Sequence, residues 1–190
     1  QLEAILATTT TEIPTDVPLL KAAPANGEPD AVADCGWIEF KLPTEPNSCF
    51  AYVPESYDGR EPWGVVVLFG APGPIDPQEV TARWNAVCEL GKFILLVPQA
   101  ADPRAWQNNE TMLVRQFYNR LVQTYTTDST RSVVLGERAG GGMAYRFAFE
   151  NRDLVRGLAV IDAVVPLGIQ VRGNDPFERL EFFLVGFKGS

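Results

Sequence analysis

The sequence predicts an α/β domain, with a doubly wound, mostly parallel β-sheet, helices on both faces and a hairpin at its N-terminal edge. Short continuous apolar runs recur along the chain, as expected for strands that are buried on both faces. Longer amphipathic stretches separate these runs, and this alternation of strand and helix is typical of parallel sheets with helical connections. The composition agrees, because 46% apolar and 21% charged residues among 190 describe a chain that can bury a core.

Residues 1–36 are predicted to be an extended arm and linker that precedes the domain. They contain four prolines, no aromatic residue, and one lysine against six acidic residues. Residues 21–34 are rich in Ala, Pro, Glu and Asp, and such a composition buries too little apolar surface to order itself. Residues 2–13 alternate weakly in hydropathy, as an isolated strand would, and no basic start precedes a long apolar run, so we expect no signal peptide. The domain itself is expected to span residues 37–190.

The predicted sheet begins with a hairpin. Residues 37–42 and 49–53 alternate in hydropathy around a Thr-Glu-Pro-Asn turn, which is a hairpin pattern. Five continuous apolar runs then predict buried strands at residues 65–69, 93–97, 133–135, 158–161 and 182–187. Cap residues, a four-residue apolar spacing and a glycine-rich turn predict three helices. These helices are expected at residues 76–90, 109–125 and 139–150.

Three cysteines are too few and too scattered for a zinc knuckle or a disulfide scaffold. If the hairpin turn is the Thr-Glu-Pro-Asn tetrapeptide, Leu42 faces Cys49 and Cys35 faces Ser56. This register keeps Cys35 away from Cys49 and favours three thiols, Cys88 being the third. A Cys35–Cys49 disulfide remains the alternative.

The chain contains no histidine, and this excludes several functions together. Ser-His-Asp and Cys-His catalysis, the commonest metal ligand and the usual general base are all removed. The net charge is −8 and no Lys/Arg cluster is present, so we expect no nucleic-acid binding. The apolar runs are far shorter than the about 20 residues of a membrane span. We therefore predict no metal, no cofactor and no membrane span.

The most informative motif is a strand, a turn and a helix start with the sequence SVVLGERAGGGMAYRFAF, at residues 132–149. Gly136 and Gly140 are four residues apart in the turn, as in the nucleophile elbow Gly-x-Ser-x-Gly, where glycines permit a tight, strained connection. Arg138 occupies the central position of the motif. A guanidinium stays protonated in proteins and cannot be a nucleophile. The motif therefore predicts a degenerate elbow.

From Ser48 to Ser190 the chain resembles the esterase branch of the α/β-hydrolases that includes polyhydroxybutyrate depolymerases and feruloyl esterases. Three segments carry the resemblance, and they occur in the order of the family: CFAYVPESYD, EPWGVVVLFG and GERAGGGMAY. The resemblance implies an α/β-hydrolase-like fold. It also implies that the elbow of this family is the segment around Gly136, Arg138 and Gly140.

The same resemblance implies that the other catalytic positions have been lost. Phe69, Gly70 and Ala71 stand where the family has His-Gly and its oxyanion loop, and Pro72 has no N–H to donate. The run at 182–187 leads into Lys-Gly-Ser, where the family has His-Gly-Thr before its catalytic Asp. We therefore expect the last strand and the histidine loop to be lacking, and no catalytic residue.

Three further residues are expected at the carboxyl edge of the sheet, where ligands bind in this class of fold: Asp102, Trp106 and Asp162. Arg138 either binds an anion there or is paired with a carboxylate. We predict the ion pair, with Asp162 as first choice and Asp102 as second. Trp106 either stacks on a planar ligand or caps the core. Glu137 and Asp162 are expected to be surface residues or members of ion pairs rather than an acid/base couple.

The sequence thus predicts a non-catalytic hydrolase-like module that binds or scaffolds a protein partner or an upstream domain of the same polypeptide. Esterase-like domains with a non-serine elbow resemble C-terminal segments of exported bacterial proteins with PDZ and trypsin-like domains, and this implies a periplasmic or secreted protein. The alternative is a serine hydrolase, or a segment of a PDZ-linked serine protease, whose catalytic residues lie outside this chain. A third function is homo-oligomerisation through an open sheet edge at residues 182–187.

Overall fold

The computed structural model describes residues 34–41, 47–169 and 182–186 of the chain. Most of the predicted arm and linker, the hairpin turn and the C-terminal Lys-Gly-Ser lie outside these residues. The expectation that the last strand is lacking concerns the same undescribed part of the chain. The domain boundary predicted between residues 36 and 37 stays a prediction.

Within the described residues, seven strands form one sheet in the order β1-β2-β4-β3-β5-β6-β7. β1 and β2 form an antiparallel hairpin at one edge, β2 is also antiparallel to β4, and the other neighbours are parallel. The predicted mostly parallel sheet with an edge hairpin is therefore confirmed. The strands are β1 (Gly36–Lys41), β2 (Ser48–Val53), β3 (Trp63–Phe69), β4 (Phe93–Pro98), β5 (Thr127–Glu137), β6 (Gly157–Ile161) and β7 (Phe182–Gly186).

Three helices connect the parallel strands where the sequence predicts them: α1 (Pro77–Gly91), α2 (Glu110–Thr124) and α3 (Ala139–Glu150). α1 begins at a proline because its φ suits the first helical turn. The carboxylate of Asp76 caps this helix by accepting the backbone N–H groups of Gln78 and Glu79 at 2.9 and 3.4 Å. The start of α1 therefore lies just after β3, at the carboxyl edge of the sheet.

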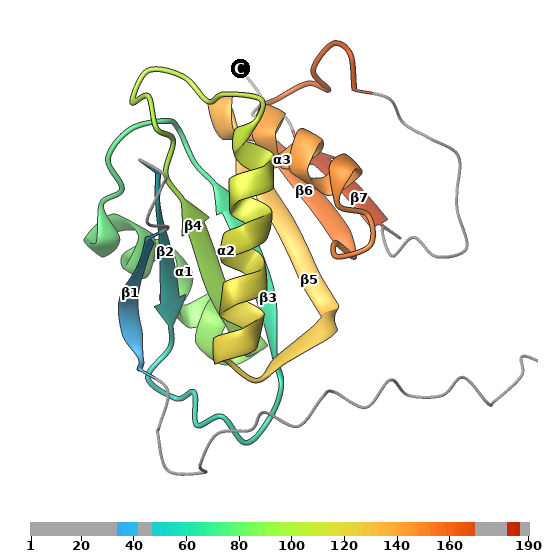
Figure 1. The fold of residues 1–190 in the computed structure, drawn as a ribbon. Helices are drawn as coiled ribbons and strands as arrows, with labels where there is room; N and C mark the ends of the chain where they lie inside the picture. Colours follow the sequence, from blue (N-terminus) through green and yellow to red (C-terminus); the bar gives the residue numbers. More distant parts are fainter. Residues whose placement is uncertain (1–33, 42–46, 170–181, 187–190) are drawn as a thin grey trace, which may run out of the picture.

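The sheet is covered on both faces, because successive side chains of a strand point to opposite sides. In β3, Val65 and Val67 belong to the core formed with α2 and α3, whereas Val66 and Leu68 belong to the core formed with α1. α2 crosses in front of the sheet and α1 lies behind it (Figure 1). This arrangement confirms the doubly wound architecture and brings the starts of α1 and α3 to the same edge of the sheet.

The register of the hairpin differs from the prediction by two residues. Phe40, and not Leu42, is paired with Cys49, and Lys41 pairs with Ser48 to close the ladder. The physical reason is burial: this register places Phe40, which is 6% exposed, in the core beside the buried Cys49. The connection between β1 and β2 is therefore longer than the tetrapeptide turn expected from the sequence.

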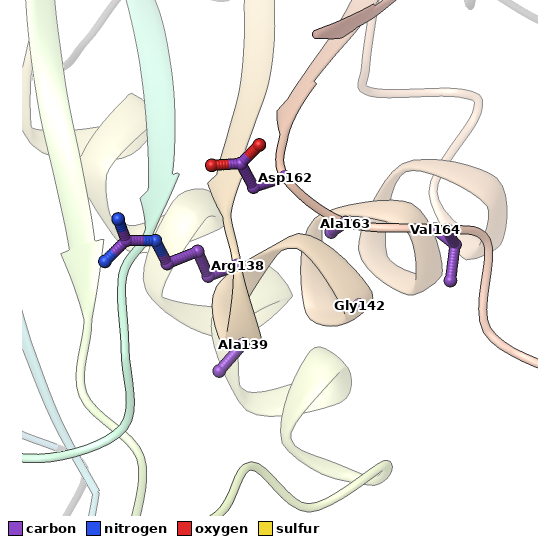
Figure 2. A pocket seen from close by; sticks show the side chains of 6 residues that line it. All are labelled: Arg138, Ala139, Gly142, Asp162, Ala163 and Val164. Carbon is purple, nitrogen blue, oxygen red and sulfur yellow. The ribbon is translucent and has the colours of Figure 1, made fainter. Parts of the chain in front are cut away.

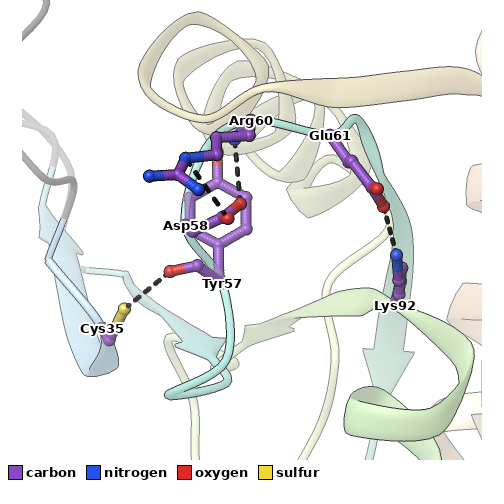
Figure 3. A network of polar contacts seen from close by, with 6 residues as sticks. All are labelled: Cys35, Tyr57, Asp58, Arg60, Glu61 and Lys92. Carbon is purple, nitrogen blue, oxygen red and sulfur yellow. Dashed lines mark hydrogen bonds and ion pairs between the residues drawn. The ribbon is translucent and has the colours of Figure 1, made fainter.

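None of the three cysteines forms a disulfide, so the prediction of three thiols is confirmed. Burial raises the pKa of the Cys49 thiol well above its ordinary value and that of Cys88 to about 12. The Cys35 thiol donates a hydrogen bond to the backbone carbonyl of Tyr57 at 3.6 Å (Figure 3). It therefore lies beside the β2–β3 loop and not beside Cys49.

The β2–β3 loop forms its other polar contacts at the amino end of the parallel strands. Arg60 pairs with Asp58 inside the loop, at 3.7 Å, and Glu61 pairs with Lys92 at the C-terminal cap of α1 (Figure 3). All four side chains are exposed, so these pairs contribute little to stability. The Glu61–Lys92 pair connects the loop to the C-terminal cap of α1, at the end of the sheet opposite the elbow.

Candidate functional site

Arg138 has the strained backbone that an elbow requires. It lies between the end of β5 and the start of α3, with φ 51° and ψ −115°. Its N–H donates to the carbonyl of Ile161 at 2.9 Å, and its carbonyl accepts the N–H of Gly141 at 3.0 Å. A residue other than glycine at positive φ costs about 1–3 kcal/mol, so the surrounding packing must hold it there. The turn is an elbow with arginine at its apex.

Close backbone approach explains the glycines of the elbow. A Cβ at Gly140 would lie 2.1 Å from the carbonyl oxygen of Phe69, at the end of β3. A Cβ at Gly136 would lie 2.4 Å from the Cβ of Ala144 in α3. These distances leave no space for any side chain. The framework that the sequence predicts at Gly136 and Gly140 is therefore built by packing of α3 against β3 and β5.

The Arg138 side chain is exposed and extends toward the ends of β3 and β4 (Figure 2). In the described part of the chain it forms no ion pair. The predicted pairing with Asp162 is therefore wrong, and so is the second choice, because Asp102 pairs with Arg104 at 3.1 Å. The reason is solvation: water screens an exposed guanidinium, so no carboxylate is needed to offset desolvation.

Two pockets meet at Arg138. The elbow pocket, of ≈ 480 Å³, is lined by Arg138, Ala139, Gly142, Asp162, Ala163 and Val164 (Figure 2). Asp162 directly follows β6 and has a φ of 54°, so two of the three described non-glycine residues with positive φ line this pocket. Backbone strain gathers at functional sites because it holds side chains in set directions. The structure thus brings together Arg138 and Asp162, as predicted, but without an ion pair.

The second pocket, here the α1 cleft, has a volume of ≈ 350 Å³ and lies between α1 and the ends of β3, β4 and β5. Phe69, Gly70 and Ala71, the predicted oxyanion loop, are among its lining residues. Its apolar wall includes Leu68, Ile75, Val80, Trp84, Val97 and Pro98. Its charged side chains are Asp76, Glu79, Arg83, Glu137 and Arg138. The cleft is therefore an apolar pocket with a charged rim.

Asp102 and Trp106 are not among the residues that line either pocket. Hydrogen bonds from the side chain and backbone of Arg104 lower the pKa of Asp102 below its ordinary value. The indole N–H of Trp106 donates to the carbonyl of Gly70 at 3.1 Å, and its ring packs edge-on against Phe69 at 5.5 Å. Trp106 therefore caps the core, which is one of the two roles that the sequence left open.

The sequence analysis missed the contribution of α1 to the site. Arg83 pairs with Glu137 at 2.9 Å and so ties α1 to the residue before Arg138. Trp84 is partly buried and lines the α1 cleft. The signal was present, since Val80, Trp84 and Cys88 repeat every four residues on one face of the helix. This face packs on the sheet, so its first turns lie beside the elbow.

A buried carboxylate, also missed, holds the loop between β4 and α2. Glu110 is 3% exposed and accepts hydrogen bonds from the side-chain amide of Asn47 at 2.6 Å and from the N–H of Ala101 at 2.8 Å. Its second oxygen accepts the N–H of Gln107 at 2.5 Å. Three donors therefore fix one carboxylate, and with it the loop that carries Trp106.

Solved structures with a similar fold are esterases and serine hydrolases. A thermostable esterase matches with a TM-score of 0.55 and 18% identity, over 70% of this chain and 42% of its own. An acetyl xylan esterase from Aspergillus awamori matches with 0.53 and 18%, over 66% and 51%. A fluorophosphonate-binding serine hydrolase of Staphylococcus aureus matches with 0.57 and 15%, over 75% and 62%. The chain thus has an α/β-hydrolase-like fold and spans roughly half the length of these proteins.

Neither a protein-family model nor a curated protein matches the chain in sequence. The likeness at this level of identity concerns the fold, which confirms the resemblance seen in the sequence. No helix among the described residues is long and apolar enough to cross a membrane. In the same residues, no three His, Cys, Asp or Glu side chains gather as ligands of a metal ion.

Proposed function

We propose that this domain is a non-catalytic α/β-hydrolase-like module, part of a larger protein, which binds a ligand or partner in the cleft beside its elbow. The observation that carries the proposal is Arg138 at the apex of an intact elbow. The strained backbone of an elbow is present, but it carries a guanidinium in place of the serine hydroxyl of the Gly-x-Ser-x-Gly motif. A guanidinium is always protonated, so it can donate hydrogen bonds and cannot attack a carbonyl carbon.

The other lining residues support the same proposal. Among the described side chains of the two pockets there is no Ser, Thr, Cys, Lys or Tyr, so no alternative hydroxyl, thiol or amine nucleophile is at hand. Ser132, the nearest serine before the elbow in β5, is buried and hydrogen-bonded to the Tyr118 hydroxyl at 2.5 Å. Glu137 is held by Arg83. With no histidine in the sequence, no general base of the usual kind is present either.

A serine hydrolase is the second candidate, and the backbone at residue 138 favours it. A strained turn costs about 1–3 kcal/mol, and the elbow of the α/β-hydrolases uses such a turn to present its nucleophile. In this case the acid and base would have to lie outside the sequence given. Arginine at residue 138 would still leave the attacking group to come from elsewhere.

One experiment separates the two candidates. The purified chain is incubated with p-nitrophenyl acetate and with a fluorophosphonate probe, beside an Arg138→Ala variant as the matched control. The proposal expects no saturable hydrolysis above buffer, no probe labelling and no difference between wild type and variant. A general base alone contributes about 10²–10⁴-fold, so its loss together with the nucleophile abolishes turnover. Saturable hydrolysis that survives repurification and is blocked by the fluorophosphonate would establish the hydrolase instead.

A further inference from the structure

The α1 cleft contains one cation that its own neighbours leave available. Asp76 accepts two backbone N–H groups of α1, and Glu137 is paired with Arg83. In the described part of the chain, the charged lining residues that form no ion pair are Asp76, Glu79 and Arg138, and Arg138 is the cation among them. A guanidinium presents a planar fork of donors that fits a carboxylate in a bidentate manner. The cleft therefore offers one site for an anionic group.

The backbone gives that cation a set direction. Because Arg138 is locked at φ 51° by contacts with Ile161 and Gly141, its side chain leaves the elbow toward the ends of β3 and β4 (Figure 2). These strand ends also line the α1 cleft. The Arg138 guanidinium and the apolar wall therefore face the same space in the α1 cleft.

The wall of the cleft selects the rest of the ligand. Trp84, Ile75 and Val80 are partly buried and pack on the core beneath α1, so they form a firm apolar surface. A pocket of ≈ 350 Å³ lies at the small end of the range for small-molecule sites, which is about 300–1,000 Å³. A single planar ring fits this volume and the flat side chain of a tryptophan. The negative charges of Asp76 and Glu79 at the same cleft disfavour a second anionic group.

We propose that the α1 cleft binds a small monocarboxylate with a planar apolar body, its carboxylate on Arg138 and its ring against Trp84. This inference rests on the proposed function, since it assigns a ligand class to the cleft of the non-catalytic domain. Ligand binding breaks no covalent bond. A cation at residue 138 can therefore serve binding, whereas hydrolysis would need a nucleophile there. Arg138 is in this role a binding residue.

The test is a titration of the ¹⁵N-labelled chain with benzoate, followed at the tryptophan indole N–H signals, which Trp→Phe variants assign. Benzoate should shift the Trp84 signal saturably in the millimolar range and leave that of Trp63, buried at the other end of β3, unchanged. Benzamide, which has the ring without the charge, should bind at least about tenfold more weakly. Terephthalate, with a second carboxylate, should bind more weakly than benzoate.

Two variants assign the effect to one side chain. Arg138→Gln should weaken benzoate binding at least about tenfold, because a neutral amide replaces the charged fork. Arg104→Gln is the matched control, since Arg104 is an exposed arginine that pairs with Asp102 outside the cleft, and binding should stay within about twofold of wild type. The absence of a saturable Trp84 shift, equal affinity for benzoate and benzamide, tighter binding of terephthalate, or an unchanged Arg138→Gln variant would each overturn the inference.

The same samples keep this inference separate from the proposed function. Release of p-nitrophenol is read in the absence of benzoate, so hydrolysis would refute the non-catalytic function by itself. Benzoate binding that does not depend on Arg138 would refute the ligand class and leave the non-catalytic function standing.

Discussion

Gly140 and Arg138 are two residues apart in one turn, yet their surroundings impose opposite demands. At Gly140 the carbonyl of Phe69 leaves no space for even a methyl group, whereas the Arg138 side chain extends into solvent at the rim of two pockets. Packing therefore restricts Gly140 to glycine. The exposed position of Arg138 tolerates other side chains. The difference teaches that the packed glycines, and not the residue at the apex, maintain the elbow of this α/β-hydrolase-like fold.

The largest expected effect comes from adding one methyl group to the framework. Gly140→Ala should lower the free energy of unfolding by about 3 kcal/mol or more, because the obstacles are backbone carbonyls that cannot turn away. Gly142→Ala is the matched control: its nearest neighbour would be the Cγ of Pro166 at 3.5 Å, and alanine favours a helix over glycine by about 0.5–1 kcal/mol. Urea denaturation of both variants measures the difference. Equal stabilities would show that the elbow is not tightly packed.

A smaller loss is expected from the buried carboxylate that supports the neighbouring loop. Glu110→Gln keeps the shape but turns an acceptor of three hydrogen bonds into a group that also donates, so one buried donor is left facing another. The free energy of unfolding should fall by about 2 kcal/mol. Glu79→Gln, an exposed acid-to-amide change on α1, should shift it by less than about 0.5 kcal/mol. A similar small shift for both variants would contradict a supporting role for Glu110.

The same contrast explains what could be predicted from the sequence. The glycine spacing and the apolar runs predict the elbow and the sheet because both follow from local backbone demands. The partner of Arg138 was predicted wrongly, because an ion pair is required only at a buried guanidinium and this side chain is exposed. Arg83 was missed because its partner Glu137 lies 54 residues away in the sequence. Glu110 was missed because its donors are a distant side-chain amide and two N–H groups of a loop, which no local pattern encodes.

Relief of backbone strain at Arg138 should raise the free energy of unfolding, in contrast to the two losses predicted above. Arg138→Gly should raise the free energy of unfolding by about 1 kcal/mol, because relief of about 1–3 kcal/mol of strain exceeds the entropy that glycine adds to the unfolded chain. Arg138→Ala removes the same guanidinium but keeps a Cβ at positive φ, so its stability should stay within about 0.5 kcal/mol of wild type. Guanidinium chloride melts of the two variants compare them. If glycine gives no gain over alanine, the backbone at residue 138 is not strained.

The smallest effect is expected at the rim, from the ion pair of Arg83 with Glu137. Its side chains are 52% and 30% exposed, so a double-mutant cycle with Arg83→Gln and Glu137→Gln should give a coupling of about 0.2–1 kcal/mol, which falls as salt is added. Arg115 and Asp153, 39% and 56% exposed and at 2.7 Å, form a bidentate pair away from both pockets, and the same cycle there should give a value at least as large. A coupling several times larger at Arg83–Glu137 would mean that the rim is held as firmly as the glycine framework. Arg138 would then be flanked by rigid structure on both sides, namely the glycine framework and the rim of the α1 cleft. The direction of its side chain would then matter for ligand binding as much as its charge does.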